Sequence, residues 1–153
     1  MNLTLHSDYS LRILLYLAEH RDRQVSTREI SDAYGISRNH LVRVVQTLDT
    51  HGFVKASAGR TGGVMLARDP AKINIGGVVR KTEPNFRIVE CFDREQNTCR
   101  ILAACSLRGV LHDALKSFFA VLDGYTLADL VRMKGSQRIS DFLPVQAITR
   151  KSA

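Results

Sequence analysis

The chain has 153 residues, which is the size of one domain with a core of its own. Its net charge of +7 at pH 7 favours an acidic partner such as nucleic acid, although a merely basic soluble protein would carry the same charge. No apolar run approaches the ~20 residues that cross a bilayer, and the start "MNLTLHSDYS" has no leader pattern, so we expect a cytoplasmic protein with no membrane partner.

The first predicted helix covers about residues 8–20. Apolar residues recur along it at helical spacing, and either Ser7 or Asp8 can cap its amino end. These apolar residues are Leu11, Leu14, Leu15 and Ala18. We therefore expect one face of this helix to pack against the core.

Two shorter helices joined by the tight turn "YGIS" follow. The first begins at a capping box formed by Ser26 and Glu29 and stops at Gly35. The second begins after Ser37 and stops at Gly52, and its apolar residues lie on one inward face: Leu41, Val44, Val45 and Leu48. This arrangement predicts a helix-turn-helix.

A β-hairpin is predicted directly after these helices. Its strands cover residues 53–57 and 64–67, and its tip is the glycine-rich stretch "AGRTGG". A helix, a helix-turn-helix and a hairpin in this order make a winged helix, in which the hairpin is the wing. With a further short helix at about residues 75–82, the expected DNA-binding domain covers residues 1–82. The predicted fold is mainly α with a β-hairpin wing.

The second helix of this unit and the wing carry the candidate DNA-binding residues. In a helix-turn-helix this helix lies in the major groove, with its first residues at the base edges. Arginine can bind guanine, and Asn or Gln can bind adenine, by paired hydrogen bonds, while the helix amino end suits a phosphate. Arginine at a wing tip suits a narrow minor groove. The candidates are Ser37, Arg38, Asn39, His40, Arg43 and Gln46 on the helix and Arg60, Thr61 and Gly62 on the wing.

A solvated polar face is the alternative explanation of these residues. Residues 38–68 contain five Lys or Arg and a single acid, Asp49. A face exposed only to water has no reason to be nearly free of acids on both the helix and the wing. We therefore favour double-stranded DNA as the partner, with phosphate contacts supplying most of the affinity.

The most regular apolar pattern lies at residues 107–122, where one stripe follows a long helix: Leu107, Val110, Leu111, Ala114, Leu115, Phe118, Phe119 and Leu122. The stripe has more apolar residues than docking on a small domain needs, so we expect the helix to pack also against its copy. The alternative is packing within one subunit only. A homodimer would bind an imperfect palindrome.

Gly124 ends this helix, and Thr126 caps a further short one. The expected dimerisation segment, made of the long helix and the short one, therefore covers residues 107–133. Residues 134–153 have weak periodicity and are predicted to form a basic, partly disordered tail.

All three cysteines lie in one stretch, "CFDREQNTCRILAAC". A disulfide would leave one thiol over in a compartment that keeps thiols reduced. Unrelated buried thiols would scatter through the core. Zinc sites usually hold closely spaced cysteine pairs, whereas the gaps here are seven and five residues. An iron–sulfur cluster accepts wider gaps, so among these four interpretations we favour a cluster-binding loop at residues 83–106 with Cys91, Cys99 and Cys105 as ligands.

Several stretches together resemble a known family. They are "SDYSLRILLYLA" at 7–18, "YGISRNHLVRVVQTL" at 34–48, "GRTGGVML" at 59–66, the three cysteines, and "LDGYTLADLV" at 122–131. On these stretches the chain resembles the nitric-oxide-sensitive repressors within the family that also holds the iron–sulfur regulator IscR. The resemblance covers about residues 1–131.

The resemblance implies a dimeric repressor in which the three cysteines hold an iron–sulfur cluster. Nitric oxide, as the signal, would attack the cluster irons, and the nitrosylated protein would release the operator DNA of nitric-oxide detoxification genes. The implied cluster is 4Fe–4S rather than 2Fe–2S, with Asp8 of the other subunit as fourth ligand. The alternative for Asp8 is an ordinary residue at a helix amino end.

Two features of the sequence argue against a His-ligated cluster and against an enzyme. The IscR branch has a His three residues after the last cysteine, whereas this chain has Arg108, which argues against a His-ligated 2Fe–2S site. There is no nucleotide-binding glycine fingerprint and no nucleophile–base pair, so we expect no enzyme. A regulator that senses iron or cluster status through the same cysteines is the alternative function.

Overall fold

The computed structural model describes residues 2–59, 62–93, 95–132, 141 and 143. Its elements are α1 (Leu5–Glu19), α2 (Thr27–Tyr34), α3 (Arg38–Thr50), β1 (Val54–Ala56), β2 (Val64–Leu66), the 3-10 turn η1 (Pro70–Lys72), α4 (Ile75–Thr82), the 3-10 turns η2 (Glu90–Phe92) and η3 (Leu102–Ala104), α5 (Leu107–Asp123) and α6 (Leu127–Arg132). This order confirms the predicted fold, mainly helical with a winged helix and a long helix after it. Among the described residues, no helix combines the length and hydropathy that a membrane crossing requires.

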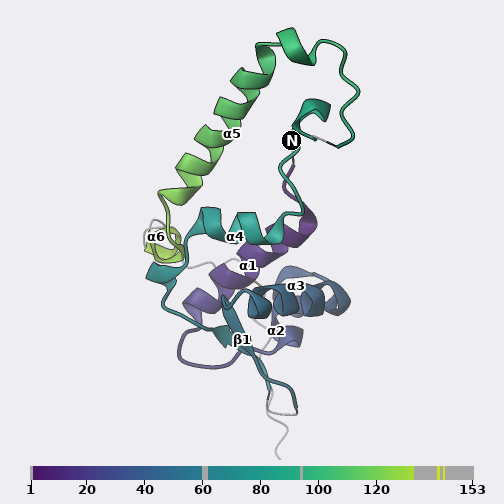
Figure 1. The fold of residues 1–153 in the computed structure, drawn as a ribbon. Helices are drawn as coiled ribbons and strands as arrows, with labels where there is room; N and C mark the ends of the chain where they lie inside the picture. Colours follow the sequence, from purple (N-terminus) through teal and green to yellow (C-terminus); the bar gives the residue numbers. More distant parts are fainter. Residues whose placement is uncertain (1, 60–61, 94, 133–140, 142, 144–153) are drawn as a thin grey trace, which may run out of the picture.

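Two parts are visible in the ribbon (Figure 1). Helices α1, α2 and α3 and the hairpin form a body at one end, and α4 lies across α1. Helix α5 extends away from this body like an arm. The loop between α4 and α5, which carries the cysteines, runs to the far end of the arm, and the start of the chain lies beside it. The body therefore presents the helix-turn-helix at the end opposite the cysteine loop.

The core is built around α1, which contacts α3, α4, α6 and β2. Three fully buried residues of α1 face these partners: Ile13, Leu14 and Leu17. The predicted inward face of α3 is confirmed, because Leu41, Val44, Val45 and Leu48 are all buried. In α1 the predicted stripe is only partly right: Leu14 and Ala18 are buried, whereas Leu11 and Leu15 lie half-buried at the edge of the core. A helix packed by several neighbours buries more than one stripe, and this pattern blurs the periodicity.

The amino end of α1 differs from the prediction. Thr4, not Ser7 or Asp8, is the N-cap, and its Oγ1 accepts a hydrogen bond from the Ser7 amide at 3.3 Å. The Ser7 hydroxyl is buried against the Thr82 hydroxyl at 2.8 Å, and Thr4 also binds Glu83. The cap prediction was wrong because Ser7 is used in a long-range contact between α1 and α4.

The two helices of the helix-turn-helix have the predicted ends. The Ser26 Oγ accepts from the Glu29 amide at 3.1 Å, and Gly35 adopts the left-handed conformation at φ 65° that ends α2. The Ser37 Oγ accepts from the His40 amide at 3.4 Å and starts α3. The capping box is only half formed, because the Glu29 carboxylate turns instead to Arg23 and Tyr16.

The hairpin pairs Val54 with Leu66, Lys55 with Met65 and Ala56 with Val64, so each strand is shorter than predicted. A bridge from Val25 to Val64 ties the wing to the segment before α2. A Cβ atom at Gly62 would lie 2.3 Å from the Ser57 carbonyl oxygen, so the turn has room only for glycine there. Arg60 and Thr61, two of the predicted wing contacts, lie outside the described residues.

The helices after the wing match their predictions. Helix α4 covers the expected residues, and α6 begins after Thr126, whose amide donates to the Asp129 carboxylate at 2.8 Å. Arg80 of α4 forms two hydrogen bonds with Asp123 at the end of α5, at 2.6 and 2.7 Å. This pair fixes the base of the α5 arm on α4. The predicted tail at 134–153 lies outside the described residues except for positions 141 and 143.

Candidate DNA face and cysteine loop

The predicted DNA-contacting residues of α3 share the outer face of that helix. Ser37, Arg38, Asn39, His40, Arg43 and Gln46 are all exposed. Among the described residues, neither Arg38 nor Arg43 forms an ion pair with an acid. The single acid of α3, Asp49, accepts from the Ala56 amide of the wing at 3.2 Å. The positive charge of this face is therefore free to meet an anionic partner.

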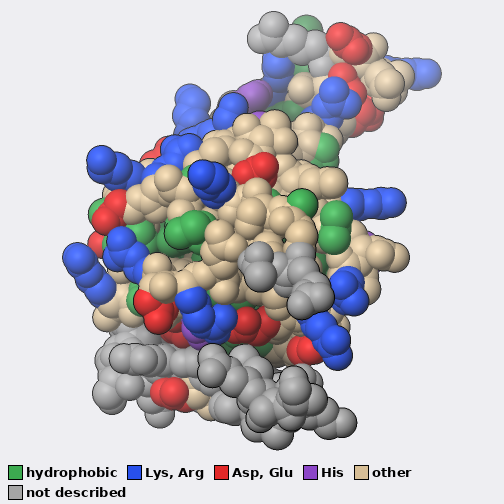
Figure 2. Space-filling view, turned by 90° about the horizontal axis from the view of Figure 1, so that it is seen from below, with side chains coloured by type: hydrophobic (Ala, Val, Ile, Leu, Met, Phe, Trp, Pro, Cys, Tyr) green, Lys and Arg blue, Asp and Glu red, His purple; other side chains and the backbone are tan. Residues whose placement is uncertain are grey.

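Figure 2 views the molecule from the end that carries α2, α3 and the hairpin, and Lys and Arg side chains stand out across this face and along its edge. Arg28 of α2 and Lys55 of β1 are exposed in addition to the predicted residues. Arg28 has a long ion-pair contact of 3.7 Å with Asp32. Neither residue is among the candidate contacts from the sequence, although Lys55 belongs to the basic stretch at 38–68, and exposure is the signal that the structure adds.

The base of the wing is held rigidly even though its tip is not described. The Ser57 Oγ donates to Gln24 Oε1 at 3.1 Å and accepts from the Gly63 amide at 3.2 Å. A Cβ atom at Gly63 would lie 2.9 Å from the Val25 carbonyl oxygen, so the strand approaches its neighbour closely. These contacts orient the hairpin relative to the segment before α2.

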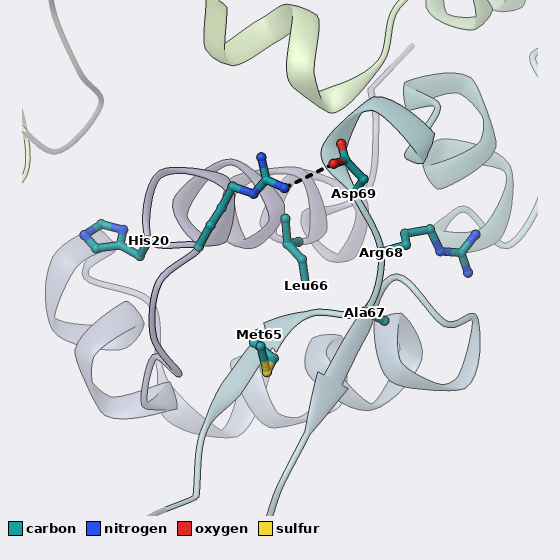
Figure 3. Close-up of a pocket in the computed structure, with 7 residues that line it drawn as sticks. His20, Met65, Leu66, Ala67, Arg68 and Asp69 are labelled. Atoms are coloured by element: carbon teal, nitrogen blue, oxygen red, sulfur yellow. Dashed lines mark hydrogen bonds and ion pairs between the residues drawn. The ribbon is translucent and has the colours of Figure 1, made fainter.

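A cavity of about 270 Å³ lies beside the wing between the end of α1 and the segment that follows β2 (Figure 3). Its charged side chains are already engaged: Arg21 pairs with Asp69 at 3.2 Å, and Arg68 donates to the carbonyl oxygens of Gly52 and His51. Figure 3 shows Arg68 directed away from Met65 and Leu66, which face the cavity from the strand. These contacts support the wing and already use the charged side chains of the cavity.

The cysteines lie on the loop that joins α4 to α5. Cys91, Cys99 and Cys105 are free thiols and half-buried. The loop is shaped by two carboxylates: Glu90 accepts from the amide and hydroxyl of Thr98, both at 2.6 Å, and the buried Asp93 accepts from the Glu95 and Gln96 amides and from Arg87. Hydrogen bonds from Glu95 and Gln96 hold the pKa of Asp93 below its usual value. Hydrogen bonds on both sides of residue 94 therefore hold the described parts of the long first gap between cysteines.

Aromatic contacts attach this loop to α5. Phe92, next to Cys91, stacks on His112 with ring centroids 4.1 Å apart and an angle of 8° between the rings. Phe86 meets Phe119 edge to face at 4.7 Å. His112 is thus used in packing, and these ring contacts join the loop to α5.

The thiols fit an iron–sulfur cluster by their chemistry, but the single chain does not bring the full ligand set together. Within the described parts of the chain, no group of three or more His, Cys, Asp or Glu side chains is close enough to hold a metal ion. The Nε atom of Arg108, three residues after Cys105, is buried and has no hydrogen-bond partner among the described residues. A buried donor of this kind favours an anionic group such as thiolate sulfur beside it.

Asp8, the candidate fourth ligand, lies on the first turn of α1 and is partly exposed. Its carboxylate pairs with Arg12 of the same helix at 2.7 Å. The start of α1 contacts Thr82 and Glu83, where the cysteine loop begins. Asp8 is therefore near the base of the loop but engaged with Arg12.

Helix α5 has no buried residue in the single chain. The predicted stripe divides in two: Leu111, Leu115, Phe118, Phe119 and Leu122 are half-buried, whereas Leu107, Val110 and Ala114 are exposed. Leu107 is 58% exposed, Val110 62% and Val121, which the pattern missed, 61%. Such an apolar face on one helix is typical of a protein–protein contact.

Comparisons with known proteins give consistent matches. The Rrf2 family, described as iron-dependent transcriptional regulators, matches residues 3–133. The HTH-type transcriptional regulator NsrR of Bacillus subtilis is 50% identical over 135 residues, which cover 88% of this chain and 92% of the relative. NsrR of Shouchella clausii is 49% identical over 132 residues, covering 86% and 89%.

Solved structures of the same fold agree. T. potens IscR superposes with a TM-score of 0.71 at 25% identity, covering 96% of this chain and 94% of that one. CymR, the global cysteine regulator of Bacillus subtilis, superposes with a TM-score of 0.66 at 28% identity, covering 88% and 98%.

Proposed function

The chain belongs to the Rrf2 family of transcriptional regulators, and on this basis we propose that it is a homodimeric repressor whose iron–sulfur cluster senses nitric oxide. Its relatives are DNA-binding regulators and not enzymes, in agreement with the absence of a catalytic motif in the sequence. The observation that carries the proposal is the place of the three free thiols, on a loop between the DNA-binding body and the exposed arm.

The outer face of α3 supports the DNA half of the proposal. Arg38 and Asn39 stand in the first turn of α3, where side chains of a recognition helix meet base edges. Gln46 follows further along the same exposed face. The Ser37 hydroxyl and the first amides of α3 suit a phosphate, and Gly62 with the predicted Arg60 and Thr61 would bring the wing to the adjacent groove.

The exposed stripe of α5 supports the homodimer. Burying one apolar side chain of this size contributes roughly 1.5–3 kcal/mol, and Leu107, Val110 and Val121 are all available. A second copy brings an identical stripe, so a two-fold contact is self-complementary. This contact would fix the relative position of two winged helices, which would then bind the two halves of an imperfect palindrome.

The cysteine loop supports the sensor half. Cys91, Cys99 and Cys105 would hold the cluster, and the buried Arg108 Nε would face its negative charge. A bound cluster supplies iron atoms with which nitric oxide can react. The nitric oxide signal comes from the family resemblance, and 4Fe–4S is favoured over 2Fe–2S because Arg108 stands where the IscR branch has a His. The protein would act in the cytoplasm, where these thiols stay reduced.

Asp8 of the second subunit is the proposed fourth ligand. Three thiols leave one iron of a 4Fe–4S cluster without a protein ligand, and a carboxylate is a weaker ligand than a thiolate. The exposed stripe at the loop end of α5 would bring the start of the partner's α1 toward this loop. Loss of the cluster would then change how the two winged helices are set.

A sensor of iron or of cluster status is the second candidate. The description of the family as iron-dependent favours it. It uses the same cysteines and the same DNA face, and differs from the first candidate in its response. Removing iron destroys the cluster and should release DNA in both cases, so the test that separates them is nitric oxide added to protein with an intact cluster. Nitric oxide should release DNA in the first case and leave it bound in the second.

The experiment is anaerobic purification of the full chain, with iron and sulfide assays, visible absorbance and DNA binding. We expect the wild type to contain iron and sulfide and Cys99→Ser to lose both. Ser106→Ala is the matched control, because the Ser106 side chain makes no capping hydrogen bond beside Cys105. A colourless wild type, or a Cys99→Ser protein with unchanged absorbance and DNA affinity, would contradict the proposal.

A further inference from the structure

Val42 is an exposed apolar residue in the middle of the DNA face. Its side chain is 44% exposed, and the other exposed residues of α3, a helix that the structure describes in full, are polar: Arg38, Asn39, His40, Arg43, Gln46, Asp49 and Thr50. Single exposed apolar residues are common on protein surfaces and usually need no explanation. This one lies among the side chains that are placed to meet base edges.

The position of Val42 on the helix is central. Arg38 precedes it by four residues, Asn39 by three, and Gln46 follows by four, so all three are neighbours of Val42 on one helical surface. The buried residues on either side, Leu41 and Val44, face the core instead. Val42 therefore points outward with the polar side chains.

The fold does not account for a valine here. A β-branched residue forms helices less well than Arg or Gln, and a side chain that stays 44% exposed gains only part of the burial of a core valine. An apolar contact outside the chain would bury the part of Val42 that the fold leaves exposed. In the major groove the apolar group at a base edge is the C5-methyl of thymine.

From this geometry we infer that Val42 contacts a thymine methyl group and selects thymine at one position of each half-site. The inference rests on the proposed DNA-binding function and adds a specificity residue to it. Arg38, Asn39 and Gln46 would read hydrogen-bonding groups of the neighbouring bases, and Val42 would separate thymine from cytosine, which lacks the methyl group. Because the dimer has two copies of α3, the preference should appear symmetrically.

The test uses DNA from which only the methyl group is removed. Duplexes that bind the anaerobically purified wild type are selected from a random-sequence pool, and each thymine in turn is replaced by deoxyuridine, which keeps every hydrogen bond. Burying one methyl group predicts a loss of wild-type affinity of about three- to fivefold at one symmetric pair of positions. The variant Val42→Ala should bind thymine and deoxyuridine there equally well.

The variant is suited to this test because alanine forms helices better than valine, so α3 should stay folded. Circular dichroism and binding of non-specific DNA check this directly. Gln46→Ala is the matched control: it should lower affinity for the selected duplex but keep the sensitivity to deoxyuridine. The inference is overturned if no deoxyuridine position weakens the wild type, or if Val42→Ala keeps the same sensitivity at that position. Failure of the proposed function looks different, because selection would then yield no preferred sequence.

Discussion

Arg12 pairs with Asp8 across one turn of α1, with Arg12 Nη2 2.7 Å from Asp8 Oδ2 and Arg12 Nε 3.0 Å from Asp8 Oδ1. This paired geometry holds the carboxylate at the start of α1, beside the base of the cysteine loop. If Asp8 ligates iron in the dimer, Arg12 must either release the carboxylate or share it. The two roles of Asp8, helix ion pair and cluster ligand, can therefore be separated.

The first prediction compares Asp8→Ala with Arg12→Gln. Both break the ion pair, which is worth about 0.3–0.5 kcal/mol for residues four apart on an exposed helix. Only Asp8→Ala removes the proposed ligand, so only that protein should lose its cluster faster to an iron chelator. The measurement is the decay of visible absorbance under anaerobic conditions. Equal decay rates for Asp8→Ala and the wild type would clear Asp8 of a ligand role.

The second prediction concerns the exposed stripe of α5. Val110→Glu places a charge in the proposed dimer contact, so we expect monomers in sedimentation equilibrium and a loss of affinity for a full palindrome down to the level of one half-site. Lys116→Glu is the matched control, because Lys116 is an exposed residue on the polar side of α5. A Val110→Glu protein that stays dimeric would show that another surface forms the interface.

The third prediction uses two adjacent glycines of α4. Both lie in the first turn of α4, and replacing a helical glycine with alanine normally stabilises by up to about 1 kcal/mol where the added methyl has room. At Gly77 the nearest atom to an added Cβ is Asn74 Oδ1 at 3.6 Å, so Gly77→Ala should raise the melting temperature. At Gly76 the added Cβ would lie 2.0 Å from Asp123 Oδ1 and push Asp123 away from Arg80.

We therefore expect Gly76→Ala to melt at a lower temperature than Gly77→Ala, because it loosens the base of the α5 arm. Thermal unfolding followed by circular dichroism measures both variants. In a protein that already carries Asp123→Ala the clash is absent, so there Gly76→Ala should raise the melting temperature relative to Asp123→Ala alone. Equal melting temperatures for the two glycine variants would mean that the Arg80–Asp123 pair does not hold the arm.

The fourth prediction concerns the effect of pH on the helix-turn-helix. Hydrogen bonds from Arg23, together with one from Tyr16, keep the pKa of Glu29 below its ordinary value. Burial raises the pKa of Tyr16 to about 12, so its hydroxyl remains a donor. A carboxyl group whose pKa is lowered by folding stabilises the fold at pH values above its unfolded-state pKa of ~4.3. This stabilisation is lost as the pH falls through the lower folded-state pKa.

Glu29→Gln should thus reduce the free energy of unfolding by about 1 kcal/mol at pH 7, and the difference from the wild type should shrink as the pH falls below about 4. Urea unfolding of both proteins at a series of pH values measures this difference in the free energy of unfolding. A difference that is constant with pH would mean that the carboxylate charge is not what stabilises the network.

The elements were predictable because their signals are local. The buried face of α3, the Gly35 stop, the α4 range and the Thr126 cap depend on neighbours along the chain. The N-cap of α1 was missed because Ser7 binds Thr82, far away in sequence. The capping box was predicted in full but forms only by half, because Glu29 binds Arg23 and Tyr16 instead.

The site was predicted less completely than the fold. The exposed side chains of α3 follow from helical spacing, whereas Val42 does not fit a rule that looks for polar residues in a DNA face. The division of the α5 stripe depends on where α4 packs, and Val121 was missed for that reason. The proposed ligand set of the cysteine loop includes Asp8 of a second subunit, and spacing along one chain cannot specify a contact between two subunits.

The central claim is that one protein couples the state of its cluster to DNA binding. The most direct measurement is a titration of the anaerobic, DNA-bound protein with nitric oxide while visible absorbance and fluorescence anisotropy of labelled DNA are recorded together. We expect cluster absorbance and anisotropy to fall in parallel, with no response from Cys99→Ser. Anisotropy that stays high after the cluster absorbance has been lost would contradict the account.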